Sequence, residues 1–494
     1  MSTERAMKST PHLTKSRYLS ALQCDRRLWL EIHDSKGGTP LGEAQRHIFR
    51  MGAEVGKAAH ELFPGGVLVE ASPANHAEAV AETDRLMADE AVPAIFEAAF
   101  EHEGVRIRVD ILERLGARRG SGKTGSRWGL REVKSSSKLK RAQHLPDLAI
   151  QKWVLEGGGI EVDSAQLVHV NKHFVRGAGA IHWRDFFQRV ELLDELKDAE
   201  VEDADGIRAR VGAMFETLGV TAAPEMEPGS FCKRPHPCRF WEQCTAKKPA
   251  AWFVRQTRAK PEKKAHMIEV TESGQTWFSD GLSDALASAS PPIWALDFEA
   301  IGAAIPFFEG TGPYRPITFQ WSLHRLAADD GEPEHFDYLA SGREDPREAV
   351  ARSLVEVLTR DDAPILAYSN YEKLRLSDLA AHVPDLAEEL NGIIDRLVDL
   401  LPIAQAHIYH RDLLGSFSLK NVGPALVPAV GYQDLTGVAN GVAALAAFAE
   451  IVEGKLTGSV EARIREELLR YCGRDTLALL EVYRAMRCGC GLAS

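Results

Sequence analysis

Residues 128–138 read WGLREVKSSSK, in which a short, mainly apolar strand-like segment ends in Glu132, Val133 and Lys134. Side chains alternate between the two faces of a strand, so Glu132 and Lys134 project together while Val133 turns to the opposite face and a core. We therefore expect the carboxylate and the ammonium to look outward into a common site. A surface ion pair on an edge strand would give the same pattern, so the neighbouring sequence has to distinguish the two.

Another acidic residue lies in the strand-like stretch just upstream. The segment IRVDIL places Asp110 between two apolar residues that alternation turns to the other face. Aspartate is disfavoured inside a strand unless it has a partner or a ligand. The connecting ARRGSGKT fits a loose phosphate-loop pattern, but a second strand follows it instead of a helix, so we expect a hairpin connection. Adjacent strands would then bring Asp110, Glu132 and Lys134 together.

Two carboxylates and one ammonium suit metal-dependent phosphodiester hydrolysis, in which the acids hold Mg²⁺ or Mn²⁺ and the lysine orients water and offsets developing charge. The spacing of aspartate, hairpin and Glu-x-Lys resembles the PD-(D/E)XK nuclease superfamily. The resemblance implies catalytic roles for Asp110, Glu132 and Lys134, with both acids as metal ligands.

Two further segments resemble the RecB-like branch of this superfamily. The predicted helix DLAIQKWVL is similar to its glutamine-bearing helix and places Gln151 at the motif position, although Leu155 stands where that branch often has tyrosine. The segment VGKAAHELF has a G-x-x-x-H pattern, in which the branch uses the histidine, here His60, as a metal ligand. An ordinary helical histidine is an equally good interpretation.

The seven cysteines are unevenly placed, and an odd number argues against a disulfide framework. Cys24 precedes the predicted nuclease core, and FCKRPHPCRFWEQC after it contains Cys232, Cys238 and Cys244. This layout resembles the iron–sulfur nucleases, such as the CRISPR-associated RecB-like family and the AddB-type helicase-nucleases. The resemblance implies a structural [4Fe-4S] cluster on these four thiolates. Because the spacing departs from the usual C-x2-C-x5-C, zinc bound by four cysteines is the competing interpretation.

A second group of acids lies in the later part of the chain. IWALDFEA carries Asp297 and Glu299 on one strand face, and YCGRDTLALLEVYRAM places Tyr471 and Asp475 one helical turn apart. Together these segments resemble the tyrosine subtype of the DEDD 3′ to 5′ exonucleases, on an RNase H-like fold. The resemblance implies four acids that hold two metal ions and a tyrosine that orients the attacking water.

The fourth acid of this group is ambiguous in AYSNYEKLRLSDL, where we assign Glu372 and keep Asp378 as the alternative. Asp399 in VDLLP is similar to the next strand of the family. Ser418 and Lys420 in GSFSLKNV are similar to its substrate-side loop. A role in the fold or at the surface is an equally good interpretation of these three residues.

With 45% hydrophobic and 26% charged residues, the chain has the composition of a globular protein, and its 494 residues suggest two to four domains. We expect an α/β protein: a PD-(D/E)XK restriction-endonuclease-like domain over 1–250, a Lys- and Pro-rich linker over 251–288, and an RNase H-like DEDD domain over 289–494. Residues 13–487, and YRPITFQWSLH in particular, resemble a bacterial family catalogued as a domain of unknown function.

Composition narrows the remaining choices. The net charge is −12, so the chain has no overall excess of positive charge for binding nucleic acid. This counts against a protein that only binds nucleic acid more than against a nuclease, because a metal-dependent nuclease needs clustered carboxylates. The first twelve residues, MSTERAMKSTPH, lack the apolar stretch of a signal peptide. The apolar run GVAALAAFAEIV is too short to span a bilayer. We therefore expect a cytoplasmic protein without a membrane partner.

These patterns predict a metal-dependent nuclease that acts on single-stranded DNA or DNA ends, with protein partners left undefined. The alternatives are an RNA-directed exonuclease, a nucleic-acid-binding scaffold with one or both sites inactive, and a cluster-bearing redox protein.

Overall fold

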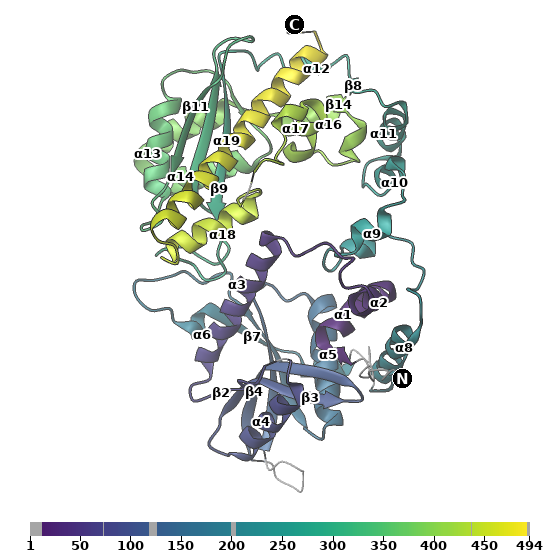
Figure 1. Cartoon of the computed structure of the whole chain (residues 1–494). Helices are drawn as coiled ribbons and strands as arrows, with labels where there is room; N and C mark the ends of the chain where they lie inside the picture. The colour runs from purple at the N-terminus through teal and green to yellow at the C-terminus, as the bar shows by residue number, and fades with distance from the viewer. Residues whose placement is uncertain (1–11, 73, 118–125, 199–203, 436, 492–494) are drawn as a thin grey trace, which may run out of the picture. The chain divides into compact units, whose positions relative to one another are not determined.

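The chain forms a mixed α/β structure of two compact units (Figure 1), each described here by itself. The computed structural model describes residues 12–72, 74–117, 126–198, 204–435 and 437–491. Unit 1 comprises Met1–Leu41 and Ile48–Lys247, and unit 2 comprises Gly42–His47 and Lys248–Ser494. Within the described ranges, no helix combines the length and the apolarity that crossing a membrane requires.

Unit 1 is built on one mixed sheet with the strand order β2-β3-β4-β5-β6-β7. Its strands are β1 (Leu13–Thr14), β2 (Val67–Leu68), β3 (Ala94–His102), β4 (Val105–Ala117), β5 (Ser126–Lys134), β6 (Val162–Val170) and β7 (Phe187–Glu191). β4 pairs antiparallel with β3 and β5, β5 pairs parallel with β6, and β1 pairs parallel with the start of β4. Residues 118–124 of the phosphate-loop-like ARRGSGKT (117–124) lie outside the described residues.

Several helices of unit 1 pack on this sheet. The helices of unit 1 are α1 (Lys15–Gln23), α2 (Asp25–His33), α3 (Glu43–Ala59, whose first turn belongs to unit 2), α4 (His76–Ala88), α5 (Arg141–Gly157), α6 (Trp183–Phe186), α7 (Leu193–Asp198), α8 (Ala204–Gly219) and α9 (Trp241–Thr245). The main core lies between the sheet and α4, α5 and α8, where Trp128 and Leu130 of β5 meet Leu148 and Val154 of α5.

Unit 2 contains a five-stranded sheet with the order β11-β10-β9-β12-β13. The strands of unit 2 are β8 (Trp277–Phe278), β9 (Ile293–Ile301), β10 (Ile317–Leu326), β11 (Glu334–Leu339), β12 (Ile365–Ala367), β13 (Leu397–Asp399) and β14 (Ile408–Tyr409). β9, β10 and β11 pair antiparallel, whereas β12 pairs parallel with β9 and β13. β8 and β14 form a separate small ladder.

Helices pack on both faces of the unit 2 sheet. The helices of unit 2 are α10 (Ala250–Arg255), α11 (Pro261–Ser273), α12 (Leu282–Ala285), α13 (Arg347–Leu358), α14 (Tyr371–His382), α15 (Ala387–Asp395), α16 (Leu400–His407), α17 (Leu419–Leu426), α18 (Gly441–Val452) and α19 (Gly458–Gly489). α13, α14 and α15 share a core with one face of β9, while α18 and α19 cover the other (Figure 1).

Residues 251–288, for which composition predicts a linker, form α10, α11, β8 and α12. Val254, Met267, Val270 and Leu282 are buried in a core shared with α16 and α19. Met267 and Val270 stand three residues apart, so they share one helix face within a Lys-rich segment. The segment therefore packs into unit 2 instead of connecting two domains loosely.

Candidate active sites

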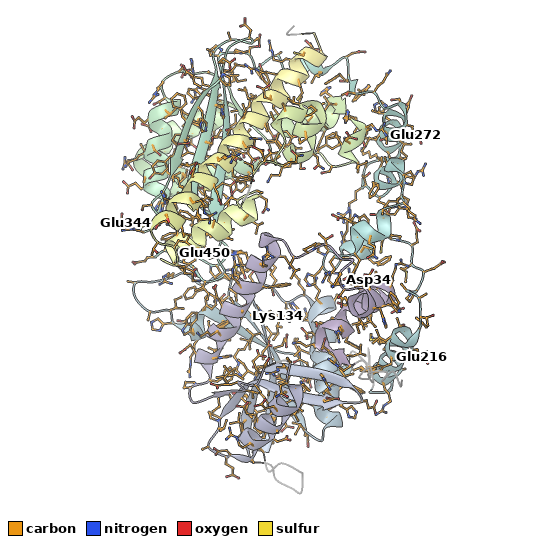
Figure 2. All side chains as sticks on the ribbon, in the orientation of Figure 1. Asp34, Lys134, Glu216, Glu272, Glu344 and Glu450 are labelled. Carbon is orange, nitrogen blue, oxygen red and sulfur yellow. The ribbon has the colours of Figure 1, made fainter. Side chains whose placement is uncertain are left out.

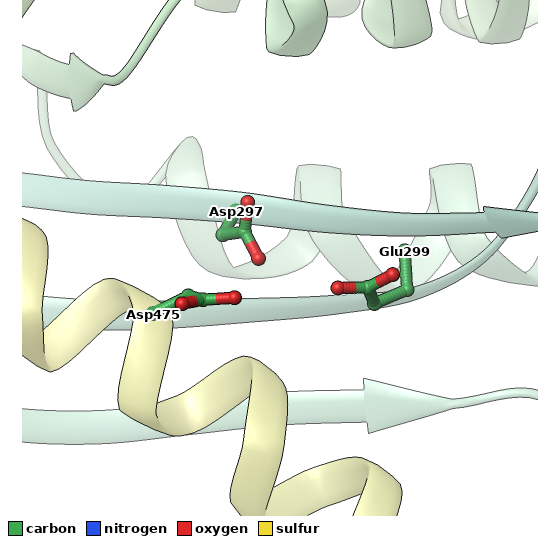
Figure 3. A group of neighbouring side chains, drawn as sticks. All are labelled: Asp297, Glu299 and Asp475. Carbon is green, nitrogen blue, oxygen red and sulfur yellow. The ribbon is translucent and has the colours of Figure 1, made fainter. Parts of the chain in front are cut away.

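The acids of β9 lie on the strand face that α19 covers. Trp294, Leu296 and Phe298 pack with α13 and α14, so the intervening Asp297 and Glu299 turn to the other face. α19 brings Asp475 to this face. Among the described residues, Asp297, Glu299 and Asp475 are the one group of His, Cys, Asp and Glu side chains whose ligand atoms all lie within 4.8 Å of one another. Figure 3 shows their carboxylates gathered between β9 and α19.

The polar residues of β10 hold α19 in place. The amide of Gln320 donates to the carbonyl of Leu468 at 2.8 Å, Ser322 Oγ lies 2.9 Å from Thr476 Oγ1, and His324 Nδ1 lies 2.8 Å from the same hydroxyl. These contacts are buried, and unmet polar groups there would be costly. Because Thr476 follows Asp475 directly, the contacts fix Asp475 against β9. They also give a structural role to three polar residues of YRPITFQWSLH, namely Gln320, Ser322 and His324.

The structure distinguishes between the two acids considered for the fourth position. Glu372, in the first turn of α14, is 3% exposed and lines the same cavity as Asp297 and Asp475. Its Oε2 atom is buried without a hydrogen-bond partner. Asp378, six residues later on α14, instead accepts a hydrogen bond from Arg375 at 2.6 Å. Glu372, and not Asp378, therefore lies with Asp297 and Asp475 at this cavity.

The four acids are protonated more readily than isolated carboxyl groups. Burial, followed by the charges of neighbouring acids, raises the pKa of Glu299 to about 8. Burial and nearby Asp399 raise that of Glu372 to about 7. The pKa values of Asp297 and Asp475 are raised in the same direction, chiefly by burial. Crowded buried carboxylates of this kind gain stability from a cation between them.

Four side chains that are not acids lie beside these carboxylates in unit 2 and complete what is called the second site below: Lys420, Tyr432, Tyr471 and Cys472. Lys420 Nζ donates to the phenol oxygen of Tyr471 at 2.8 Å. The hydroxyl of Tyr432 donates to Asp475 Oδ1 at 2.6 Å, and the thiol of Cys472 donates to Asp297 Oδ2 at 3.5 Å. Sequence reasoning missed Tyr432 and Cys472. No sequence pattern pointed to Tyr432. Cys472 could have been found from its spacing, because it lies three residues before Asp475 and therefore on the same face of the helix.

A cavity of about 440 Å³ opens beside these acids. It combines three of the acids with aromatic, aliphatic and hydroxyl groups, and its lining includes Asp297, Glu372, Asp475, Tyr368, Phe417, Ser418 and Lys420. Asp399 lies outside this lining: it caps α16 by accepting from the Leu401 amide at 2.9 Å, and it accepts from the Ser369 amide at 2.9 Å. Asp399 thus shapes the loop that leads into α14.

In unit 1, Glu132 lies at the centre of a buried ionic network. Lys134, labelled in Figure 2, ends β5, and its Nζ donates to Glu132 Oε1 at 2.5 Å. Glu132 is 1% exposed, and Trp128 and Leu130 on the same strand face are in the main core. The carboxylate therefore does not look outward as expected, because α5 covers this face; the Lys134 side chain remains 30% exposed.

α5 and β4 supply three more members of this first site. Gln151 Nε2 donates to Glu132 Oε2 at 2.7 Å and to Asp147 Oδ1 at 3.1 Å, while its own Oε1 is buried without a partner. Asp110 Oδ2 accepts from the backbone amide of Val133 at 2.7 Å. Sequence reasoning missed Asp147, although it stands four residues before Gln151 and so shares its helix face.

The pKa values of the two motif acids in the first site, the unit 1 cluster of Asp110, Glu132, Lys134, Asp147 and Gln151, are shifted in opposite directions. Burial and the charge of Glu132 raise the pKa of Asp110 to about 7. Burial also acts to raise the pKa of Glu132, but the adjacent Lys134 and Lys15 outweigh it and lower that pKa below the usual range. Lys15, which sequence reasoning also missed, lies 3.0 Å from Glu132 and 3.4 Å from Asp147.

His60 lies in a single 3-10 turn after α3, where its ring stacks on Phe96 of β3 with centroids 3.8 Å apart. Phe96 pairs with Ile111, the neighbour of Asp110. Burial lowers the pKa of His60, which favours the neutral imidazole that a metal can bind. Its role as a ligand stays a prediction.

The four cysteines of the predicted cluster line one cavity in unit 1. Cys24 joins α1 to α2, and Cys232, Cys238 and Cys244 follow α8; all four border the same cavity beside Phe240 and Trp241. Burial, with smaller effects of the neighbouring thiols, raises the pKa values of Cys24 and Cys238. Cys472 lies instead in the second site, and Cys488 is exposed.

Comparison with known proteins gives one family match. The model of a domain of unknown function, DUF2779, matches residues 294–418. The match runs from β9 to the residue before α17, and so contains Asp297, Glu299 and Glu372 but not Tyr471 or Asp475. It agrees with the expected likeness to a family of unknown function over this part of the chain. No curated protein matches the sequence.

Proposed function

We propose that the chain is a metal-dependent nuclease with two active sites, acting on single-stranded DNA or DNA ends. The observation that carries the proposal is the convergence of Asp297, Glu299, Glu372 and Asp475 from three elements on one site beside a large cavity. The order β11-β10-β9-β12-β13, with α19 across β9, supports an RNase H-like DEDD exonuclease fold for unit 2.

The donor set of the second site fits divalent cations. All four acids offer hard oxygen ligands, which suit Mg²⁺ and Mn²⁺. Glu372 Oε2 is buried without a partner, and mutual repulsion contributes to the raised pKa of Glu299. When bound there, such ions would supply Lewis acidity and a water of lowered pKa.

The chain's own groups would position the substrate and the water. Tyr471 lies one turn from Asp475 and is held by Lys420, so its phenol oxygen can orient a water near the acids. The rings of Tyr368 and Phe417 line the adjoining cavity. Aromatic rings stack on nucleobases without sequence preference, which suits a terminal nucleotide of any identity.

The first site supports a PD-(D/E)XK reaction centre in unit 1. Asp110 and Glu132 come from neighbouring antiparallel strands, and Lys134 follows Glu132 by two residues on the same face. Gln151 Oε1 is buried and unpaired next to these acids, so an acceptor is available for a bound water or ligand. The two carboxylates would hold Mg²⁺ or Mn²⁺, and Lys134 would orient water and offset charge on the phosphate.

The cysteine cavity supports a structural [4Fe-4S] cluster. A single tetrahedral zinc ion would bring its sulfur ligands within about 3.8 Å of one another, given Zn–S bonds of about 2.3 Å. Among the described residues, no three of the cysteines approach one another within 4.8 Å, whereas all four border one cavity. The wider separation favours a polynuclear cluster that ties α1 to the segment after α8.

The proposal is tested with anaerobically purified protein, 5′-labelled single-stranded DNA and Mn²⁺. Wild type is compared with Lys134→Ala, Asp475→Ala and the double variant, and Lys152→Ala serves as a control because Lys152 pairs with Glu156 elsewhere on α5. We expect each single variant to lose part of the degradation, the double variant to lose all of it, and the control to match wild type.

A matched single-stranded RNA substrate tests the alternative for unit 2. Degradation of RNA alone, abolished by Asp475→Ala, would replace DNA as the proposed substrate. Tight DNA binding by wild type without cleavage in Mn²⁺ or Mg²⁺ would overturn the nuclease proposal in favour of a binding scaffold.

A further inference from the structure

Lys15 reaches the first site from a part of the chain that no catalytic motif covers. Its Nζ donates to both oxygens of Glu132 at 3.0 Å and lies 3.4 Å from Asp147 Oδ1. The side chains of Glu132 and Asp147 are 1% and 3% exposed, whereas that of Lys15 is 21% exposed. The Lys15 ammonium therefore bridges two buried acids, while the Lys15 side chain remains partly exposed to solvent.

Lys15 repeats the contacts of the motif lysine. Lys134 Nζ donates to Glu132 Oε1 and to Asp147 Oδ2 at 2.6 Å, so each lysine binds the same two acids. Burying a second ammonium group costs desolvation free energy, so the ion pairs of Lys15 are weak evidence that it stabilises the fold. A pair of ammonium groups beside a phosphodiester, in contrast, would stabilise the extra negative charge of its transition state.

The backbone around Lys15 is held at both ends of α1. Before it, Leu13 pairs with Val105 of β4, and Thr14 Oγ1 caps the helix by accepting from the Arg17 amide at 3.3 Å. After it, the side-chain Nε2 of Gln23 donates to the carbonyls of Phe231 and His236 at 2.8 and 2.9 Å. α1 then ends at Cys24 in the cysteine cavity. Such support preorganises a side chain for catalysis.

We propose that Lys15 is a second active-site lysine, which contacts the scissile phosphate together with Lys134, and that Asp147 positions both ammonium groups. The proposal rests on the proposed nuclease activity of the first site and adds a residue to its reaction centre. Removing Lys15 then has two opposite effects: cleavage falls, while Mn²⁺ binding is kept or strengthened because Glu132 and Asp147 lose a competing cation.

The test uses full-length protein in the Asp475→Ala background, in which only the first site is expected to cleave. Lys15→Met, Lys15→Arg and the control Lys152→Met are compared by single-turnover cleavage of labelled single-stranded DNA in Mn²⁺. Binding of Mn²⁺ alone is measured by electron paramagnetic resonance, and thermal melting reports folding. We expect Lys15→Met to cut cleavage about 100-fold with unchanged or tighter Mn²⁺ binding, and Lys15→Arg to recover part of the rate.

Two results would overturn the role of Lys15 alone: cleavage by Lys15→Met equal to that of the control, or a parallel loss of cleavage and Mn²⁺ binding, which would make Lys15 a structural ion-pair partner. Asp147→Asn provides a second measure, since it should lower the rate and leave the melting temperature near that of the parent. A parent that binds Mn²⁺ but does not cleave would overturn the nuclease proposal for this site, and with it the role of Lys15.

Discussion

Lys420 Nζ donates a hydrogen bond to the phenol oxygen of Tyr471 across 2.8 Å, and so joins α17 to α19 at the edge of the unit 2 acids. The same ammonium lies 4.6 Å from the centre of the Tyr471 ring. Its charge acts to lower the pKa values of Glu299 and Asp475, against the larger effect of burial. Lys420 thus both orients the tyrosine and partly neutralises the acids.

The first prediction concerns this pair. In the Lys134→Ala background, Lys420→Met and Tyr471→Phe should each slow the proposed exonuclease reaction of unit 2 about 10- to 100-fold, because both disturb the phenol that we propose orients the attacking water. The double variant should be little slower than either single variant, since residues that act as a unit are not additive. Multiplied losses in single-turnover assays would show that the two residues act independently.

The second prediction separates the two acids of α14. Glu372→Gln should abolish second-site cleavage and weaken Mn²⁺ binding, because it removes a buried carboxylate that we propose as a metal ligand. Asp378→Asn should leave both properties near wild type, since Asp378 pairs with Arg375 and does not line the cavity. Isothermal titration with Mn²⁺ and the labelled-DNA assay provide the measurements. The reverse pattern would assign Asp378 as the fourth acid.

The third prediction concerns pH and stability. Glu299, with a pKa of about 8 in the folded chain, binds more protons than an unfolded glutamate, whose pKa is about 4.3. Its contribution to the stability of the metal-free protein therefore declines as pH rises between these two values, by at most about 1.4 kcal/mol per pH unit. Thermal melting in EDTA from pH 5.5 to 8.5 should show a smaller decline for Glu299→Gln than for wild type.

Added Mn²⁺ should reverse this trend, because metal binding requires the ionised carboxylates and so gains strength as pH rises. Equal pH slopes for wild type and Glu299→Gln would contradict the raised pKa. The Asp378→Asn variant is a suitable reference, since its side chain lies outside the acid group.

The fourth prediction concerns the cysteines. Cys232→Ser should remove most of the iron from anaerobically purified protein and lower the melting temperature, since the cluster would join α1 to the segment after α8. Cys488→Ser, at an exposed position, should keep both at wild-type levels. Iron and zinc are quantified together in each preparation. One zinc ion per chain without iron would replace the cluster by the competing tetrahedral site.

Local periodicity was enough to predict which side chains share a face. Alternation along β9 puts Asp297 and Glu299 on one side, and a four-residue step on α19 puts Tyr471 beside Asp475; the structure has both arrangements. The α/β class follows from the same periodicities. These features are readable because side-chain direction depends on the backbone of the residue itself and its nearest neighbours.

Contacts between distant segments needed the tertiary structure. Lys15 meets Glu132 because β1 pairs with β4, and the position of Glu372 at the cavity depends on how α14 packs against β9. The buried position of Glu132 follows from the cover provided by α5. A one-dimensional pattern specifies the faces of each element. Which faces meet is decided by the packing that buries the most apolar surface while pairing the buried charges.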